Sequence, residues 1–342
     1  MLDSGPERGR SPRGRRRGAI RGTGRRAWIA SAGATALLSL LAPGLRASSP
    51  EVRIVVPFAP GGASDRIARA FAVPLASVMH ERVVVENTDE AGAIRAVVEA
   101  TPDGRTLLLG STGSMVLLPL VSAAPPLDPR SDLAPVALLG SASQVLTVHP
   151  SLPVTRLGAL VSWLRARPDT VAMGAPGVGT LPHLTGLLFA RRAGVRLRQV
   201  FAASSAQVIN AHLKGEIPVA FESQVVEHVR QGRLRAIAVM TSGRMHALPD
   251  VPTVSEAGMP GIDVRNWLAL FTSPATPAAV CSQMALLVQA AATHASLAAL
   301  ERDGFELRPG SPAQLARFVS NEVERWTHYV SELGLAPARP TR

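Results

Sequence analysis

The most informative part of the chain is Arg53-Ile-Val-Val-Pro-Phe-Ala-Pro-Gly-Gly-Ala-Ser-Asp65. The β-branched run Ile54-Val-Val56 predicts a short buried strand. The two prolines and two glycines that follow cannot continue it, because proline lacks a backbone donor and glycine is freed from steric limits. Ser64-Asp65 then begins a stretch with helical spacing. A strand, a glycine-rich turn and a helix start predict free backbone N–H groups at the carboxyl end of a sheet, where small anions bind.

The segment before this strand has the features of an export leader. Residues 1–26 are rich in arginine, residues 27–41 are apolar, and Leu45-Arg-Ala47 is a weak cleavage site of small residues. The apolar part is shorter than the roughly 20 residues of a membrane-spanning helix, so we expect a cleaved leader over residues 1–47. Thr23-Gly-Arg25-Arg26-Ala-Trp28-Ile29 resembles a twin-arginine motif, and the expected export route is therefore twin-arginine or Sec.

The positive charge of the chain belongs mainly to this leader. The whole chain has a formal net charge of +11, whereas residues 1–46 hold ten arginines against Asp3 and Glu7, a net of +8 that leaves +3 for the remainder. The charge therefore does not indicate nucleic-acid binding. Cys281 is the only cysteine, which excludes an intramolecular disulfide, a cysteine-type zinc site and a lipid anchor after the leader. No cofactor and no metal site are predicted.

After the leader, apolar runs typical of strands alternate with helical patterns, which predicts an α/β fold with mostly parallel sheets. Pro74 lies inside the first helical pattern and is expected to kink or shorten it. The expected strands are 83–85, 106–109, 136–139, 145–148, 171–173, 219–221, 236–239 and 268–271, and the expected helices are 67–79, 157–166, 184–193, 206–214, 278–292 and 312–333.

A series of short motifs, in a shared order and spacing, resembles the tripartite tricarboxylate transporter substrate-binding family, also called Bug proteins. The resemblance covers about residues 52–336. Any one of the motifs is weak, but their order makes the match specific. They are Ile54–Gly62 with Asp65, Val83–Asn87, Pro102–Gly110, His149–Pro153, Gly177–Gly179 with His183, Leu234–Val239, Leu248–Val254 with Glu256–Gly258, and Thr276-Pro277.

The resemblance implies a two-lobed periplasmic-binding-protein-like fold of type II, with mostly parallel sheets flanked by helices and two hinge strands. Residues 48–144 and 241–342 would then form a discontinuous lobe one, and residues 145–240 would form lobe two. The chain would cross between the lobes near 139–148 and again near 237–243. The ligand would lie in the cleft between the lobes.

The first loop is a candidate carboxylate site. We expect the backbone N–H groups of Gly61, Gly62, Ala63 and Ser64 to bind one ligand carboxylate with help from the helix dipole, although a plain turn would have the same sequence. Asp65 either caps its own helix or takes the ammonium group of an amino-acid ligand. The other predicted contacts in this segment are Pro60 and Phe58, the latter as a pocket wall or a core aromatic.

The second loop, Gly174-Ala-Pro-Gly-Val-Gly-Thr-Leu-Pro-His183, repeats the pattern of a strand, glycines and a helix start. Its family counterpart faces the first loop across the cleft, so Gly177 and Gly179 are predicted to cradle a second polar group. Thr180 could add a hydroxyl. His183 is expected to hold the loop or, alternatively, to contact the ligand.

The remaining predicted contacts are Ser111 and Thr112 at the end of the third strand, Ser204, and Glu222. Two departures from the family pattern concern the same cleft. Ala202 and Ala203 stand where the family usually has tyrosine and lysine, which should enlarge or depolarise the pocket. Glu222 stands where aspartate is common. The segment after Asn87 also lacks the usual glycine-rich sequence.

The resemblance implies a periplasmic solute-binding protein that captures a small organic acid or amino acid for membrane permease subunits. It is expected to be a monomer. The alternative is a ligand-sensing partner of a membrane sensor kinase, with the same fold. Catalysis is not expected, because the chain has no Gly-x-Ser-x-Gly, no Walker motif and no His-Glu-x-x-His, and its eight histidines are scattered.

Overall fold

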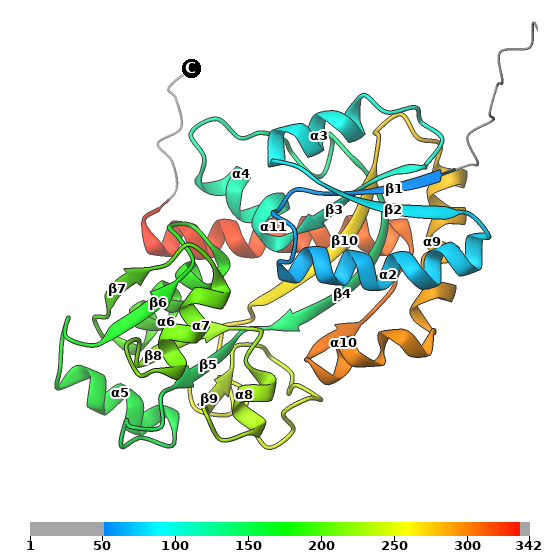
Figure 1. Cartoon of the computed structure of the whole chain (residues 1–342). Helices are drawn as coiled ribbons and strands as arrows, with labels where there is room; N and C mark the ends of the chain where they lie inside the picture. Colours follow the sequence, from blue (N-terminus) through cyan, green and yellow to red (C-terminus); the bar gives the residue numbers. More distant parts are fainter. Residues whose placement is uncertain (1–50, 336–342) are drawn as a thin grey trace, which may run out of the picture. The chain divides into compact units, whose positions relative to one another are not determined.

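Two β-sheets organise the part of the chain that the structure describes, residues 51–335 of a computed structural model (Figure 1). The predicted leader, its twin-arginine motif and its cleavage site lie outside the described residues. Each sheet has helices on its faces, which confirms the predicted two-sheet α/β architecture.

The first sheet has six strands in the order β11-β4-β10-β3-β1-β2. Its central strands are almost completely buried, as expected for apolar runs with helices on both faces. The strands are β1 (Glu51–Val56), β2 (Arg82–Asn87), β3 (Thr106–Ser111), β4 (Ala134–Ser143), β10 (Arg265–Thr272) and β11 (Phe305–Leu307).

The second sheet has five strands in the order β7-β6-β8-β5-β9, and all of them come from one continuous part of the chain. The strand β7 was not predicted, because its sequence Arg-Gln-Val-Phe is short and partly polar at an exposed sheet edge. The strands are β5 (Val145–Val148), β6 (Ala172–Ala175), β7 (Arg198–Phe201), β8 (Val219–Glu222) and β9 (Arg235–Val239).

Both sheets are mixed, which corrects the expectation of mostly parallel sheets. Four strand pairings are parallel, β1 with β2 and β3 and β6 with β7 and β8. Five pairings are antiparallel, and each of these involves β4, β5 or β10. The parallel pairs are joined through helices, whereas β4 and β5 are nearly continuous and enter the two sheets in the direction opposite to their neighbours.

The helices fill the connections between the strands. Helix α2 runs through Pro74 without being shortened, and Pro74 is buried, so packing offsets the missing backbone hydrogen bond. The elements are α2 (Ala63–Met79), α3 (Glu90–Val98), the π-helical η1 (Thr112–Leu117), α4 (Leu118–Val121), α5 (Leu157–Arg165), α6 (Leu181–Ala193), α7 (Ser205–Leu213), α8 (Val226–Arg230), α9 (Ala278–Ala292), η2 (Ala295–Leu297), α10 (Ala298–Arg302) and α11 (Pro312–Leu333).

The chain passes from the first sheet to the second at Gln144 and returns between Met240 and Val264. These three residues are joined by backbone hydrogen bonds. Gln144 N–H donates to Val264 O (3.4 Å), Met240 N–H to Gln144 O (2.8 Å) and Val264 N–H to Met240 O (2.7 Å). The two crossing segments therefore lie side by side. The lobe boundaries at 144/145 and 240/241 stay a prediction.

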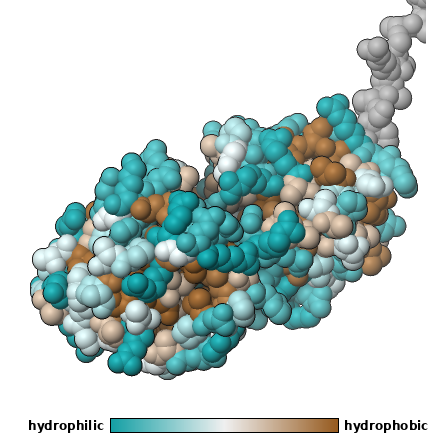
Figure 2. Space-filling view, turned by 60° about the horizontal axis from the view of Figure 1, so that its bottom comes forward, coloured by the Kyte–Doolittle hydropathy of each residue, from teal (hydrophilic) through white to brown (hydrophobic). Residues whose placement is uncertain are grey.

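The surface shown in Figure 2 is mainly hydrophilic, with apolar residues in small groups, as is normal for a surface that contacts water. Among residues 51–335, no single helix is both long and apolar enough to cross a membrane. Only α9 taken together with Ala295–Arg302, across a bend of 71°, would reach that length and composition.

Candidate functional site

A cavity of about 410 Å³ brings together segments from both sheets. The first sheet contributes the β1–α2 loop and the end of β3, and the second contributes the starts of α6 and α7 and the end of β8. Nine of the predicted site residues line it: Phe58, Gly61, Gly62, Ala63, Ser64, Ser111, Thr180, Ser204 and Glu222. A larger cavity of about 710 Å³ beside α5 and β9 contains none of the predicted residues.

The β1–α2 loop is shaped by Asp65. Its carboxylate accepts hydrogen bonds from Gly61 N–H (2.8 Å), from Arg69 Nε (3.0 Å) and from Asn87 Nδ2 (3.0 Å). Burial works against ionisation of Asp65, but these hydrogen bonds outweigh it and lower its pKa. Gly61 has φ +83°, a left-handed conformation that favours glycine. Asp65 is thus occupied with holding the loop.

The start of α2 leaves backbone donors without partners. Within residues 51–335, the N–H groups of Gly62, Ala63 and Ser64 make no hydrogen bond, and all three residues line the cavity. The N-cap Gly62 provides no side-chain cap. Unpaired N–H groups at the positive end of a 17-residue helix attract an anion. The N–H of Gly61 does not contribute, because Asp65 accepts it.

The second loop is held by two internal hydrogen bonds. Gly179 N–H donates to His183 Nδ1 (3.1 Å), and the Thr180 hydroxyl donates to Gly177 O (2.8 Å). His183 therefore holds the loop, and burial lowers its pKa, while the nearby Gln199 acts in the opposite direction. Thr180 and the first residues of α6 line the cavity, but the proline at the second helical position has no N–H to offer.

Helix α7 contributes a third helix start that was not predicted as a cradle. Its N-cap Ser204 accepts a hydrogen bond from Gln207 N–H (3.3 Å), and Ser205 and Ala206 line the cavity with N–H groups that have no partner in the described chain. The helical pattern at 206–214 and the serine before it could have revealed this site. Because β7 was not predicted, the sequence of strand, turn and helix before α7 was not recognised.

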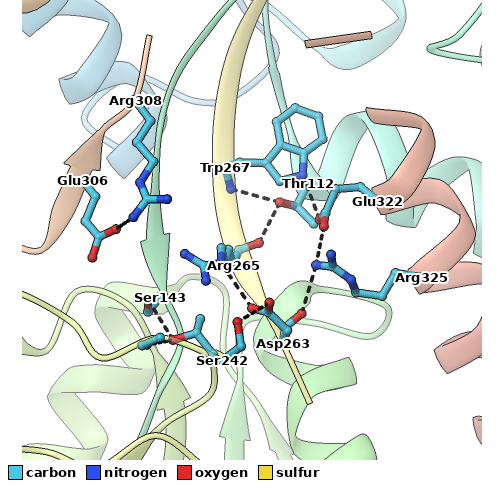
Figure 3. Close-up of polar contacts among 12 residues, drawn as sticks. Thr112, Ser143, Ser242, Asp263, Arg265, Trp267, Glu306, Arg308, Glu322 and Arg325 are labelled. Carbon is cyan, nitrogen blue, oxygen red and sulfur yellow. Dashed lines mark hydrogen bonds and ion pairs between the residues drawn. The ribbon is translucent and has the colours of Figure 1, made fainter. Parts of the chain in front are cut away.

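Six predicted residues do not line the cavity: Pro60, Asp65, Thr112, Gly177, Gly179 and His183. Thr112 is fully buried, and its hydroxyl joins the start of η1 to β10. It donates to Arg265 O (2.9 Å) and accepts from Trp267 N–H (3.0 Å) (Figure 3). The neighbouring Ser111 lines the cavity, but its hydroxyl accepts Ser114 N–H (3.2 Å) in a reciprocal cap.

A polar network joins β10 to α11 (Figure 3). Trp267 Nε1 donates to Glu322 Oε2 (3.1 Å), and Arg325 Nη1 donates to Glu322 Oε1 (2.6 Å). Burial raises the pKa of Glu322, and the nearby Arg325 opposes that change. Trp267 is completely buried, so it supports the strand rather than lining the cavity.

Sequence reasoning missed several residues of the cavity wall. Arg66, in the first turn of α2, lines the cavity, and its Nη2 donates to Oε1 of Gln224 (2.6 Å), which follows β8 and also lines the cavity. Gln144 was missed, although it is a polar residue between two apolar strand runs. The other lining residues that were not predicted are Ala59, Gly113, Leu181, Pro182, Ser205, Ala206, Ser223 and Asn266.

Among the described residues, Glu222 and Arg66 are the only ionisable residues on the cavity wall. Glu222 is 2% exposed, and its burial raises the pKa of its carboxyl to about 8, with Ser205 opposing the shift. Among residues 51–335, no group of three or more His, Cys, Asp or Glu side chains is placed to hold a metal ion. The cavity therefore offers backbone amides, one guanidinium and one buried carboxyl.

The family model described as the tripartite tricarboxylate transporter family receptor matches residues 67–335. The chain belongs to this receptor family. The match confirms the resemblance seen in the motifs. It also places this receptor in a family of periplasmic solute-binding proteins, which is not an enzyme class.

Individual relatives agree with the family. Protein BugT of Bordetella pertussis is 31% identical over 290 residues, which cover 83% of this receptor and 89% of BugT. The structure of R. palustris Rpa4515 with adipate superposes with a TM-score of 0.75 at 30% identity, covering 84% of this receptor and 98% of that protein. The structure of MatC from Rhodopseudomonas palustris with bound malate gives a TM-score of 0.71 at 29% identity. The match covers 82% of this receptor and 98% of MatC.

Proposed function

We propose that this receptor is exported to the periplasm and captures a small organic acid in the 410 Å³ cavity for the membrane subunits of a tripartite tricarboxylate-type transporter. The observation that carries the proposal is the convergence of three helix starts, those of α2, α6 and α7, on one cavity that also receives Arg66. Each start presents the positive end of a helix dipole.

The ligand class follows from the charge of the cavity wall. Unpaired N–H groups come from the first turn of α2, which follows a strand of the first sheet, and from the first turn of α7, which follows a strand of the second sheet. One ligand with an acidic group at each end could therefore be bound by both helices at once. Solved relatives hold adipate and malate, which are both small dicarboxylic acids. We propose that the receptor binds its ligand without changing it chemically.

A thermal-shift panel tests this proposal. The panel contains acetate, butyrate, succinate, malate, adipate, citrate, aspartate, glutamate and benzoate. A ligand present at a hundredfold excess over its Kd should stabilise the folded protein by about 2.7 kcal/mol. If none of these acids raises the melting temperature, acid capture is the wrong function.

A single substitution tests the backbone donors. Ala63→Pro removes one unpaired N–H at the first position of α2, where proline is tolerated because the preceding residue is extended (ψ 172°). We expect affinity for the acid to fall at least about tenfold, since a hydrogen bond to a charged group contributes about 1.5–3 kcal/mol. Ala278→Pro is the matched control, at the first position of α9 and outside the cavity. Equal affinities of the two variants would contradict the assignment of the amides.

The transporter partner has its own test. Cells that take up the identified acid should lose this uptake when either this receptor or the permease subunits are deleted. Uptake that continues without the receptor would contradict the transport role while leaving acid binding intact.

A further inference from the structure

Two buried polar atoms on the cavity wall have no hydrogen-bond partner among residues 51–335. They are Gln144 Oε1 and Glu222 Oε1, and each residue is 2% exposed. A buried polar atom without a partner costs free energy comparable to a lost hydrogen bond. Both residues belong to the cavity, so a ligand is the natural source of the missing partners. Glu222 can donate from this position when its carboxyl is protonated, and Gln144 can donate when its amide is turned so that the NH₂ group takes the place of the oxygen.

The sheet holds the backbones of these two residues at neighbouring positions, and both residues line the cavity. Glu222 pairs in register with Val145, the residue directly after Gln144. The backbone of Gln144 is fixed on both sides, since its N–H donates to Val264 O (3.4 Å) and its carbonyl accepts from Met240 N–H (2.8 Å). Both residues therefore stand on rigid strand segments where the chain crosses between the sheets.

Within the part of the chain that the structure describes, no cation pairs with Glu222. Its neighbours β5 and β6 have no ionisable residue, and the elements α6 and α7 that pack on β8 bring His183 and His212, both with lowered pKa values. The arginines of α6 lie in its last turn. Across the cavity, Arg66 is hydrogen-bonded to Gln224 and Asp65 is bonded to its own loop.

We propose that Glu222 and Gln144 form the specificity-determining end of the cavity, where Glu222 in its protonated form donates a hydrogen bond to an oxygen of the bound acid. The Gln144 amide completes the contact. This inference rests on the proposed capture of an acid. It assigns to this end a ligand group that accepts a hydrogen bond, a carboxylate or hydroxyl oxygen, in preference to an ammonium group.

The chemistry of the group explains this preference. A carboxyl whose pKa is about 8 is mostly protonated at pH 7, and an anionic ligand nearby favours the protonated form further. An ammonium group would instead require Glu222 to ionise. The two classes of ligand therefore have opposite dependences on pH.

Isothermal titration calorimetry with malate and adipate at pH 7 and pH 9 tests the inference. Both acids are fully ionised over this range, so the change comes from the protein. We expect affinity to fall about tenfold at pH 9, because only the protonated fraction of Glu222 binds. Glu222→Gln should bind at pH 7 within about threefold of the original protein and lose the pH dependence, since an amide also donates and does not titrate.

Two further variants make the result specific. Gln144→Met keeps the volume but removes the amide, and it should weaken binding about tenfold while leaving the pH dependence in place. Glu216→Gln alters an exposed carboxylate outside the cavity and should change neither property. Circular dichroism checks that each variant is folded.

A second readout needs no ligand. The infrared difference spectrum between the original protein and Glu222→Gln at pH 7 should contain the band of a protonated carboxyl group. A carboxylate band at pH 7 would overturn the inference.

The outcomes separate this inference from the proposed function. Binding of an acid that is independent of pH and unaffected by Glu222→Gln overturns the inference alone. Tighter binding of aspartate at pH 9 than at pH 7 overturns it in favour of an ammonium site. If no acid of the panel binds to the original protein, both proposals fail.

Discussion

Replacing Asp65 with asparagine should destabilise the protein through the β1–α2 loop. The carboxylate is 3% exposed and accepts hydrogen bonds from Gly61 N–H, Arg69 Nε and Asn87 Nδ2. Asparagine keeps one acceptor oxygen but places an NH₂ group where the other oxygen accepts. At least one buried donor is then left without an acceptor.

The magnitude follows from these contacts. A buried donor without a partner costs about 1–3 kcal/mol. The ion pair with Arg69 adds only about 0.3–0.5 kcal/mol, because that side chain is 51% exposed and the pair is an i,i+4 pair on a helix. We therefore expect Asp65→Asn to lower the free energy of unfolding by about 1.3–3.5 kcal/mol at pH 7. Affinity for the acid should fall as well, since the loop positions the free N–H groups.

The cost of this substitution should depend on pH. The pKa of Asp65 in the folded protein is lowered below that of the unfolded chain. The ionised carboxylate therefore contributes its full stabilisation above the unfolded pKa of about 4, and this contribution is lost as the pH falls through the folded pKa. The difference between the original protein and the variant should shrink at pH 3.

Urea unfolding at pH 7 and pH 3 measures both effects. Asp169→Asn is the control, because Asp169 pairs with Arg196 on the surface and has a left-handed φ of 58° that asparagine tolerates. We expect this control to change stability by less than about 0.5 kcal/mol. If Asp65→Asn costs no more than the control at pH 7, or equally much at both pH values, the reasoning about the loop is wrong.

Three further predictions concern the core. Gly186→Ala should lower the free energy of unfolding by about 1–2 kcal/mol, because the new methyl group would overlap Met173 Sδ. Gly158→Ala places its methyl group in open space and should raise the free energy of unfolding by about 0.5–1 kcal/mol. Chemical denaturation of both variants checks the contrast. Burial lowers the pKa of His212 to about 4, so the unfolded chain binds a proton at this residue more readily than the folded protein does. The free energy of unfolding should therefore fall by about 2 kcal/mol from pH 7 to pH 5. In urea titrations, His212→Gln should lack this contribution to the pH dependence. Trp267→Phe removes the indole N–H that donates a hydrogen bond to the buried carboxyl of Glu322 on α11. We expect this change to lower the free energy of unfolding by about 2–3 kcal/mol. A melting temperature equal to that of the original protein would refute the prediction.

The strand–turn–helix pattern at residues 53–65 was readable from the sequence because it depends on local chemistry. β-branched residues predict the strand, prolines end it, and the glycine with positive φ permits the turn. The same reasoning predicted α11, where Ser311 caps the helix and Pro312 begins it. It missed β7, whose partly polar sequence gives no strand signal at a sheet edge.

Residues with the same local signal were separated only by the tertiary structure. Ser111 and Thr112 are adjacent hydroxyls at the end of one strand, yet Ser111 lines the cavity and Thr112 is bound to β10. Asp65 and Arg66 are also adjacent, but the first holds its loop while the second lines the cavity. A side chain's role here depends on which way it leaves the backbone and on what packs against that side.

The sequence by itself indicated most of the strands and helices, the glycine-rich helix starts and the resemblance to a receptor family, because each depends on residues close together in the chain. The tertiary structure decided which of these starts share one cavity, and it brought Gln144 next to Glu222, 78 positions later in the chain. The register of β5 against β8 sets that proximity. Burial of both side chains in one cavity, and hence the raised pKa of Glu222, follows from packing that no local pattern encodes.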